Sequence, residues 1–163
     1  MNASSSLTAV PLTADAFAPF GEVLEVAGPP DKIINQGKCG RFHDRARLDF
    51  GGGAAGISLF QAELRATPYL LDLLERHPLG SQAFVPMSQS RFLVTVAEDA
   101  GGVPGPVRAF IARAGQGINL HRNVWHGVLC PLDGAGLYAV IDRIGEGNNL
   151  EEYWLPQPVA ITV

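Results

Sequence analysis

Two short segments hold most of the side chains in this sequence that are able to do acid–base or metal chemistry. Residues 75–84 contain Glu75, His77 and Gln82, and residues 121–126 contain His121 and His126. Three of the four histidines of the chain lie in these two segments. An imidazole titrates near neutral pH and also binds metals, so two imidazole-bearing segments suggest one site built from two strands.

The first segment predicts a polar patch on one face of a strand. Glu75 and His77 are two residues apart and therefore face the same side of an extended chain. Pro78 and Gly80 interrupt that strand, and Gln82 begins the next one, where its side chain can return to the same interior. A carboxylate, an imidazole and an amide on one face suit a metal ion or a polar substrate. The alternative is a surface hairpin that ends in a histidine.

The second segment is harder to place on one face. His121 and His126 are five residues apart, so an unbroken strand would point them to opposite sides, and a turn or bulge at 122–123 is needed to restore the face. A third and weaker cluster is formed by Arg41, His43 and Asp44, where the carboxylate can orient the imidazole. Structural roles are the alternative for both groups.

The elements that must position these residues are short strands. Hydrophobic residues make up 47% of the 163 residues and charged residues 17%, and there are 19 glycines and 12 prolines. This composition predicts one compact domain, 1–163, of many short strands joined by turns. Thr13 is expected to cap a helical turn over 14–20. The leucine spacing of 69–76 fits a helix or a strand, and we predict a strand because its neighbours are strands. The other expected strands are 22–26, 57–64, 91–97, 107–112, 117–121, 125–130 and 136–142. Eight or nine such strands imply a sandwich or barrel.

Bulk properties exclude several classes of protein. A net charge of −4 gives no reason to expect a nucleic-acid partner. The sequence has no apolar run long enough to span a membrane and no signal-peptide pattern at residues 1–11. Cys39 and Cys130 form no CxxC pair, so we expect reduced thiols in a cytoplasmic protein, with one disulfide as the alternative. There is no nucleophile elbow and no phosphate-binding glycine loop.

The spacing Glu75-x-His77-x4-Gln82, followed by His126, resembles the two motifs of the cupin barrel. In the first motif Glu75 takes the place of the first histidine and Gln82 that of the glutamate. The resemblance implies a mainly β, cupin-like β-barrel or jelly roll with a few short helical turns. It also implies a metal site made of Glu75, His77, Gln82 and His126.

A closer resemblance, which covers essentially the whole chain, is to the ureidoglycolate lyase family. It rests on residues 34–37, 41–44, 75–87, 121–126 and 141–143, in order and spacing. It implies an enzyme of allantoin and purine breakdown that splits ureidoglycolate into glyoxylate and urea, as a homodimer with a small-molecule substrate. It also implies a divalent metal such as Ni²⁺ as a stimulant. The alternatives are an amidohydrolase that releases ammonia and carbon dioxide, and a non-enzymatic cupin that binds a small carboxylate.

Residue roles follow from this resemblance and from the chemistry of the substrate. His77 and His126 are expected to be the base and the acid, in an order that the sequence leaves open. His121 or Arg122 would bind the carboxylate, and Gln82 the urea group. If a metal binds, His121 would take over part of the proton transfer. The remaining expected substrate-binding residues are Arg76, His43 and Arg41.

Overall fold

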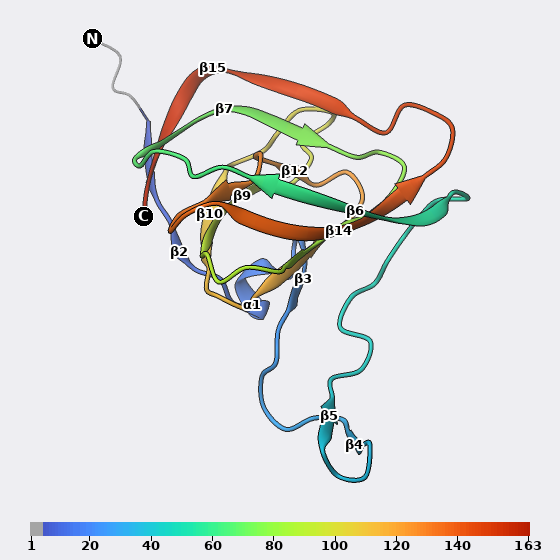
Figure 1. Cartoon of the computed structure of the whole chain (residues 1–163). Helices are drawn as coiled ribbons and strands as arrows, with labels where there is room; N and C mark the ends of the chain where they lie inside the picture. The colour runs from blue at the N-terminus through green and yellow to red at the C-terminus, as the bar shows by residue number, and fades with distance from the viewer. Residues whose placement is uncertain (1–4) are drawn as a thin grey trace.

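The computed structural model describes residues 5–163 and contains two β-sheets that face each other and nearly close into a barrel (Figure 1). The order of the five-stranded sheet is β3 (Gly21–Leu24), β11 (Gly117–Leu120), β8 (Gln82–Pro86), β14 (Gly136–Ile144), β6 (Ala54–Ala62). The order of the eight-stranded sheet is β1 (Ser6–Thr8), β15 (Glu151–Thr162), β7 (Tyr69–Arg76), β12 (Trp125–His126), β9 (Phe92–Ala97), β10 (Arg108–Ala112), β2 (Val10–Pro11), and β13 (Cys130–Pro131) also pairs with β9. The predicted mainly β, barrel-like fold is confirmed.

A separate hairpin, β4 (Lys32–Ile34) and β5 (Cys39–Arg41), forms its own two-stranded sheet. Figure 1 shows it projecting from the barrel at the end of two connecting segments. Its turn contains two residues with left-handed backbone, Asn35 at φ 51° and Gln36 at φ 60°.

The single helix among the described residues, α1 (Ala14–Phe17), is shorter than the expected 14–20. Thr13 caps it as predicted, since its Oγ1 accepts a hydrogen bond from the Ala16 N–H at 3.3 Å. Pro19 has no N–H with which to continue the helical hydrogen bonds. The chain turns instead, and the Phe20 N–H donates to the Phe17 carbonyl at 2.8 Å.

The ambiguous segment 69–76 is a strand, as predicted, and pairs with β15 and β12. The strand expected over 125–130 was wrong as one element, because it divides into β12 and β13 around Gly127. The 12-residue strand β15 was missed. Pro156 and Pro158 make its sequence unlike a strand, and its register with β7 shifts between Trp154 and Val159.

The eight-stranded sheet has an apolar core on each of its faces. One core lies between the two sheets and contains Phe84 from β8 together with Val94 and Val96 from β9. The other core lies on the opposite face of the eight-stranded sheet. It is formed mainly by side chains of that sheet's own strands and includes Leu74 and Trp125. Side chains of β7, β12 and β9 therefore divide between two different environments.

Cys39 and Cys130 are free thiols, which agrees with the expected reduced state. Among residues 5–163 no helix is long and apolar enough to cross a membrane. The prediction that residues 1–11 are not a signal peptide falls partly outside the described residues.

Candidate active site

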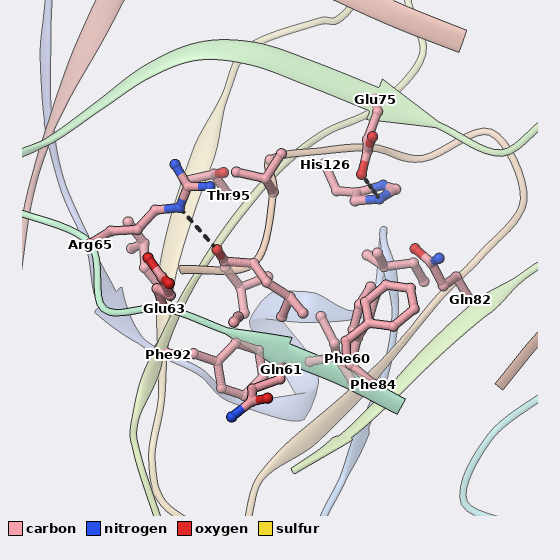
Figure 2. Close-up of a pocket in the computed structure, with 18 of the residues that line it drawn as sticks. Phe60, Gln61, Glu63, Arg65, Glu75, Gln82, Phe84, Phe92, Thr95 and His126 are labelled. Atoms are coloured by element: carbon pink, nitrogen blue, oxygen red, sulfur yellow. Dashed lines mark hydrogen bonds and ion pairs between the residues drawn. The ribbon is translucent and has the colours of Figure 1, made fainter. Parts of the chain in front are cut away.

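A cavity of about 680 Å³ opens between the two sheets, and its lining includes Glu75, Gln82 and His126 from the two histidine segments but not His77 or His121. Figure 2 shows Glu75 and His126 on one side of this cavity, with Gln82 beside them. Its wall is part apolar and part polar. The apolar part includes Phe60, Phe84, Phe92, Ile118 and Leu120, and the polar part consists of Gln61, Glu63, Arg65, Glu75, Gln82, Thr95 and His126. A concave space that combines apolar walls with convergent polar groups is the usual form of a small-molecule site.

Strand pairing brings Glu75 and His126 together. The two residues are direct partners in the antiparallel pair of β7 and β12, so their side chains leave the sheet on the same face. His126 Nε2 lies 3.7 Å from Glu75 Oε1, and the His126 side chain is buried. Pairing between strands about fifty residues apart in the sequence thus creates a carboxylate–imidazole pair at the cavity wall.

His77 completes this cluster from the end of β7. Its ring centroid is 5.2 Å from that of His126, and its Nδ1 lies 2.6 Å from the Asn149 carbonyl oxygen. His126 Nδ1 lies 3.2 Å from the Val124 carbonyl oxygen. A carbonyl only accepts, so the Nδ1 of each ring carries a proton and donates it. Both Nε2 atoms are buried without a hydrogen-bond partner.

Burial determines the protonation of His126. Desolvation, followed by the nearby charge of His77, lowers the pKa of His126 to about 3, although its hydrogen bond to Val124 acts in the opposite direction. Burial also raises the pKa of Glu75, against the effect of the His77 charge. His126 is therefore a neutral imidazole at neutral pH and serves as an acceptor, either of a proton or of a metal bond.

The cluster fits a divalent metal ion. Donor atoms of Glu75, His77 and His126 all lie within 4.8 Å of one another. Gln82 lines the same cavity, and its Oε1 is buried and unpaired because its Nε2 donates to Asp142 at 3.2 Å. Backbone carbonyls that hold Nδ1–H and leave Nε2 free are the usual support of metal-binding histidines. Of the expected metal set, Glu75, Gln82 and His126 line the cavity, and His77 joins Glu75 and His126 from beside it.

Two other predicted residues are held elsewhere by partners distant in sequence. A turn does occur at 122–123, with Asn123 at φ 66°, but it does not bring His121 to the cavity. His121 Nε2 lies 2.8 Å from Glu22 Oε1. Arg122 makes a two-pronged ion pair with Asp49, at 2.7 and 3.0 Å.

The other three predicted substrate-binding residues also lie outside the cavity lining. Arg76 follows Glu75 on β7 and contacts acidic side chains on the opposite face of the sheet. Arg41 and His43 belong to the projecting hairpin and its exit, where Arg41 Nη2 donates to His43 Nδ1 at 2.8 Å. The chain's own fold does not bring these residues to the cavity.

Two residues of the site gave no recognisable signal in the sequence. Arg65 lines the cavity and is the one arginine or lysine in its wall, and its Nε donates to the Leu129 carbonyl at 3.2 Å. Asn149 orients His77 through its backbone carbonyl and holds the turn after β7 by accepting the Leu79 N–H at 2.8 Å. A backbone contact carries no side-chain signature, so only the folded chain identifies it.

Known structures support the assignment of the fold. A dTDP-sugar isomerase from Desulfovibrio desulfuricans G20 is similar with a TM-score of 0.51 and 17% identity, and the match covers 85% of this chain and 83% of that one. This likeness concerns the fold alone. Together with the cluster of two imidazoles and a carboxylate, it defines the class of the protein as a cupin-like barrel with a polar cavity.

The profile of the ureidoglycolate lyase family matches residues 4–162, and the chain belongs to this family. A ureidoglycolate lyase of Rhodobacter capsulatus is 62% identical over 152 residues, which are 93% of this chain and 94% of the relative. A ureidoglycolate lyase of a Chelativorans species is 49% identical over 95% of each chain. The resemblance inferred from the sequence motifs is confirmed.

Proposed function

We propose that this protein cleaves ureidoglycolate into glyoxylate and urea. The observation that carries the proposal is the convergence of Glu75, His77 and His126, with donor atoms within 4.8 Å of one another, beside a cavity that Glu75 and His126 line, in a chain that belongs to the ureidoglycolate lyase family along its length. The activity named for the similar proteins requires proton transfer at a small polar substrate, and this cluster offers the groups for it.

The reaction moves one proton within the substrate. The hydroxyl of the central carbon loses its proton, the C–O bond becomes a carbonyl, and the C–N bond breaks with its electron pair on nitrogen. That nitrogen then takes a proton and leaves as urea. No net proton is gained or lost, so one group that accepts the hydroxyl proton and returns it to nitrogen is sufficient.

His126 is our candidate for that group. It is neutral and its Nε2 has no hydrogen-bond partner, so a lone pair is available for the hydroxyl proton. The lowered pKa makes this imidazole a weak base, and in this proposal Glu75 at 3.7 Å stabilises the imidazolium that forms. His77, whose ring lies beside it, is the second acid–base residue. Positioned proton transfer of this kind contributes roughly 10²–10⁴ to a rate.

Gln82 and Arg65 are our candidates for substrate binding. The unpaired Oε1 of Gln82 can accept a hydrogen bond from the urea N–H groups. The carboxylate role, expected for His121 or Arg122, passes in this proposal to Arg65. Both earlier candidates have acidic partners, whereas Arg65 lines the cavity with a guanidinium that pairs with carboxylates in a two-pronged way.

A divalent ion such as Ni²⁺ is the proposed stimulatory cofactor, held by Glu75, His77, His126 and Gln82. When bound, such an ion polarises a substrate oxygen as a Lewis acid and makes its proton easier to remove. One carboxylate and an amide supply little negative charge, so binding is expected to be weak and pH-dependent.

The proposal includes a cytoplasmic homodimer. On the outer side of the five-stranded sheet, the edge strand β6 exposes Ile57 (75%) and Leu59 (66%), and Leu59 is in register with Ala139 and through it with Val85. Adjacent exposed apolar side chains on an edge strand favour burial against a second copy. Light scattering at low micromolar concentration should give twice the 17.3 kDa mass of the chain.

Product analysis tests the reaction. The purified protein is incubated with both enantiomers of ureidoglycolate, and glyoxylate, urea and ammonia are measured over time, with His43→Asn as a matched histidine variant away from the cavity. Equal amounts of glyoxylate and urea are expected, with His43→Asn close to the wild type. Ammonia without urea would identify an amidohydrolase. Absence of turnover with either enantiomer would favour a carboxylate-binding cupin.

A further inference from the structure

The strand that carries His126 is very short. β12 consists of Trp125 and His126 alone, and its register with β7 rests on the single pair of His126 and Glu75. Its pairing with β9 adds two residue pairs. Backbone pairing over two residues fixes a strand only weakly, yet the His126–Glu75 distance has to be maintained for any shared chemistry.

Side chains on the opposite face of the sheet supply the missing connection. The Arg76 guanidinium lies 4.5 Å from the centroid of the Trp125 ring. Arg76 Nη1 is 2.7 Å from Asp99 Oδ1, and that same oxygen accepts the Trp125 indole N–H at 3.0 Å. On its other side the Nε and Nη2 of Arg76 both contact a single oxygen, Glu151 Oε2, at 2.7 and 2.6 Å. The network therefore joins β7, β12, the segment after β9 and the start of β15.

The residues of this network alternate with those of the active site. Arg76 is the neighbour of Glu75 on β7, and Trp125 is the neighbour of His126 on β12, so each pair projects to opposite faces of the sheet. Any movement of Trp125 along β12 would move His126 by the same amount. The Arg76 side chain is only 13% exposed, whereas those of Asp99 and Glu151 are 33% and 43% exposed, so the guanidinium is the most shielded of the three charged groups.

We propose that Arg76 is a positioning residue, which fixes His126 opposite Glu75 by clamping Trp125 and Asp99 from behind the sheet. The proposal rests on the proposed function only for its kinetic consequences. Its structural claim is that Arg76 sets the relative position of the His126 imidazole and the Glu75 carboxylate, although it contacts neither group.

The test compares Arg76→Met with Arg91→Met. Methionine keeps much of the length of the side chain but removes the guanidinium. Arg91 makes a two-pronged ion pair with Asp133, at 2.7 and 2.9 Å, next to the start of β9 and away from the cavity lining. Three quantities are measured for each variant: Ni²⁺ affinity by calorimetry, the imidazole ¹⁵N shifts of His126 and His77 in metal-free protein, and kcat and KM with ureidoglycolate.

Arg76→Met should weaken Ni²⁺ binding roughly tenfold or more, as loss of support around metal ligands does, and lower kcat more than it raises KM. It should also shift the His126 imidazole signals. Arg91→Met should leave the Ni²⁺ affinity and the kinetic constants within about twofold of the wild type, and the imidazole signals unshifted. Arg76→Lys should recover part of the loss, because lysine keeps the charge without the planar fork.

Equal behaviour of Arg76→Met and Arg91→Met in affinity and in the His126 signals would overturn the proposal. If Arg76→Met does not fold, Arg76→Lys and Trp125→Phe, which loses the indole N–H, are judged by the same criteria. If the wild type binds no Ni²⁺, the imidazole signals alone decide. A wild type that does not turn over ureidoglycolate would reject the proposed function but leave the affinity and the His126 signals to decide on Arg76.

Discussion

Replacement of His126 by asparagine should make the stability of the fold less sensitive to acid. Burial lowers the pKa of His126 to about 3, whereas the ordinary pKa of an exposed imidazole is about 6.5. As pH falls through 6.5 the unfolded chain takes up a proton that the folded chain refuses. The free energy of unfolding therefore falls with pH between about 6.5 and 3, and this part of the loss is absent when the imidazole is absent.

The size of the effect follows from the two pKa values. Between pH 7.5 and pH 5.5 the single residue removes about 1.4 kcal/mol from the free energy of unfolding, since each unit of pH below 6.5 is worth about 1.36 kcal/mol. Asparagine retains a side-chain N–H that can donate to the Val124 carbonyl, as Nδ1 does in the wild type. The variant is thus expected to fold while losing the titrating ring.

The assay is urea unfolding at pH 7.5, 6.5 and 5.5, with a chelator present and at fixed protein concentration. His43→Asn, in the exposed exit of the hairpin, is the matched control and should follow the wild type. Groups away from His126 titrate equally in all three proteins, so the difference between wild type and His126→Asn reports the buried imidazole together with its electrostatic coupling to its neighbours. Parallel pH dependences, within about 0.5 kcal/mol, would refute the conclusion that this ring is neutral and desolvated.

Three further expectations concern catalysis and packing. His77→Ala should lower kcat roughly 10²-fold and His43→Ala much less, and a folded His77→Ala with normal kcat would remove His77 from the mechanism. Chelator-treated enzyme should keep measurable activity and gain more with Ni²⁺, and Glu75→Gln should reduce that gain more than the basal rate; complete loss on chelation would make the ion essential. Gly127→Ala should cost about 1–3 kcal/mol by calorimetric melting, because the new Cβ would lie 2.1 Å from Thr95 Oγ1. An unchanged Tm would show that Thr95 moves aside without cost.

Local sequence determined the parts of the site that depend on strand periodicity. Glu75 and His77 share a face because they are two residues apart on one strand, and Gln82 begins the next strand as its position after Pro78 and Gly80 implies. The composition of short apolar runs and turns determined the mainly β class. Glu75, His77 and Gln82 lie within a few residues of the turn at Pro78 and Gly80, so their placement could be predicted without knowledge of distant contacts.

Tertiary structure alone decided which of the remaining polar residues join the site. His121 and Arg122 lie in the same motif as His126, but Glu22 and Asp49, about 99 and 73 residues away in the sequence, hold them outside the cavity. No local pattern encodes a partner at that separation.

The folded chain also supplied residues to which no sequence pattern pointed. Arg65 reaches the cavity wall because the chain after β6 passes beside Leu129, and Asn149 orients His77 through a backbone carbonyl. Strand β15 went unrecognised because its two prolines oppose a strand, yet pairing with β7 on one side and β1 on the other compensates for them. The sequence by itself therefore determined which faces of its strands are polar. The pairing of distant strands determined which of those faces meet, because a contact between two segments depends on both of them and cannot be predicted from either one alone.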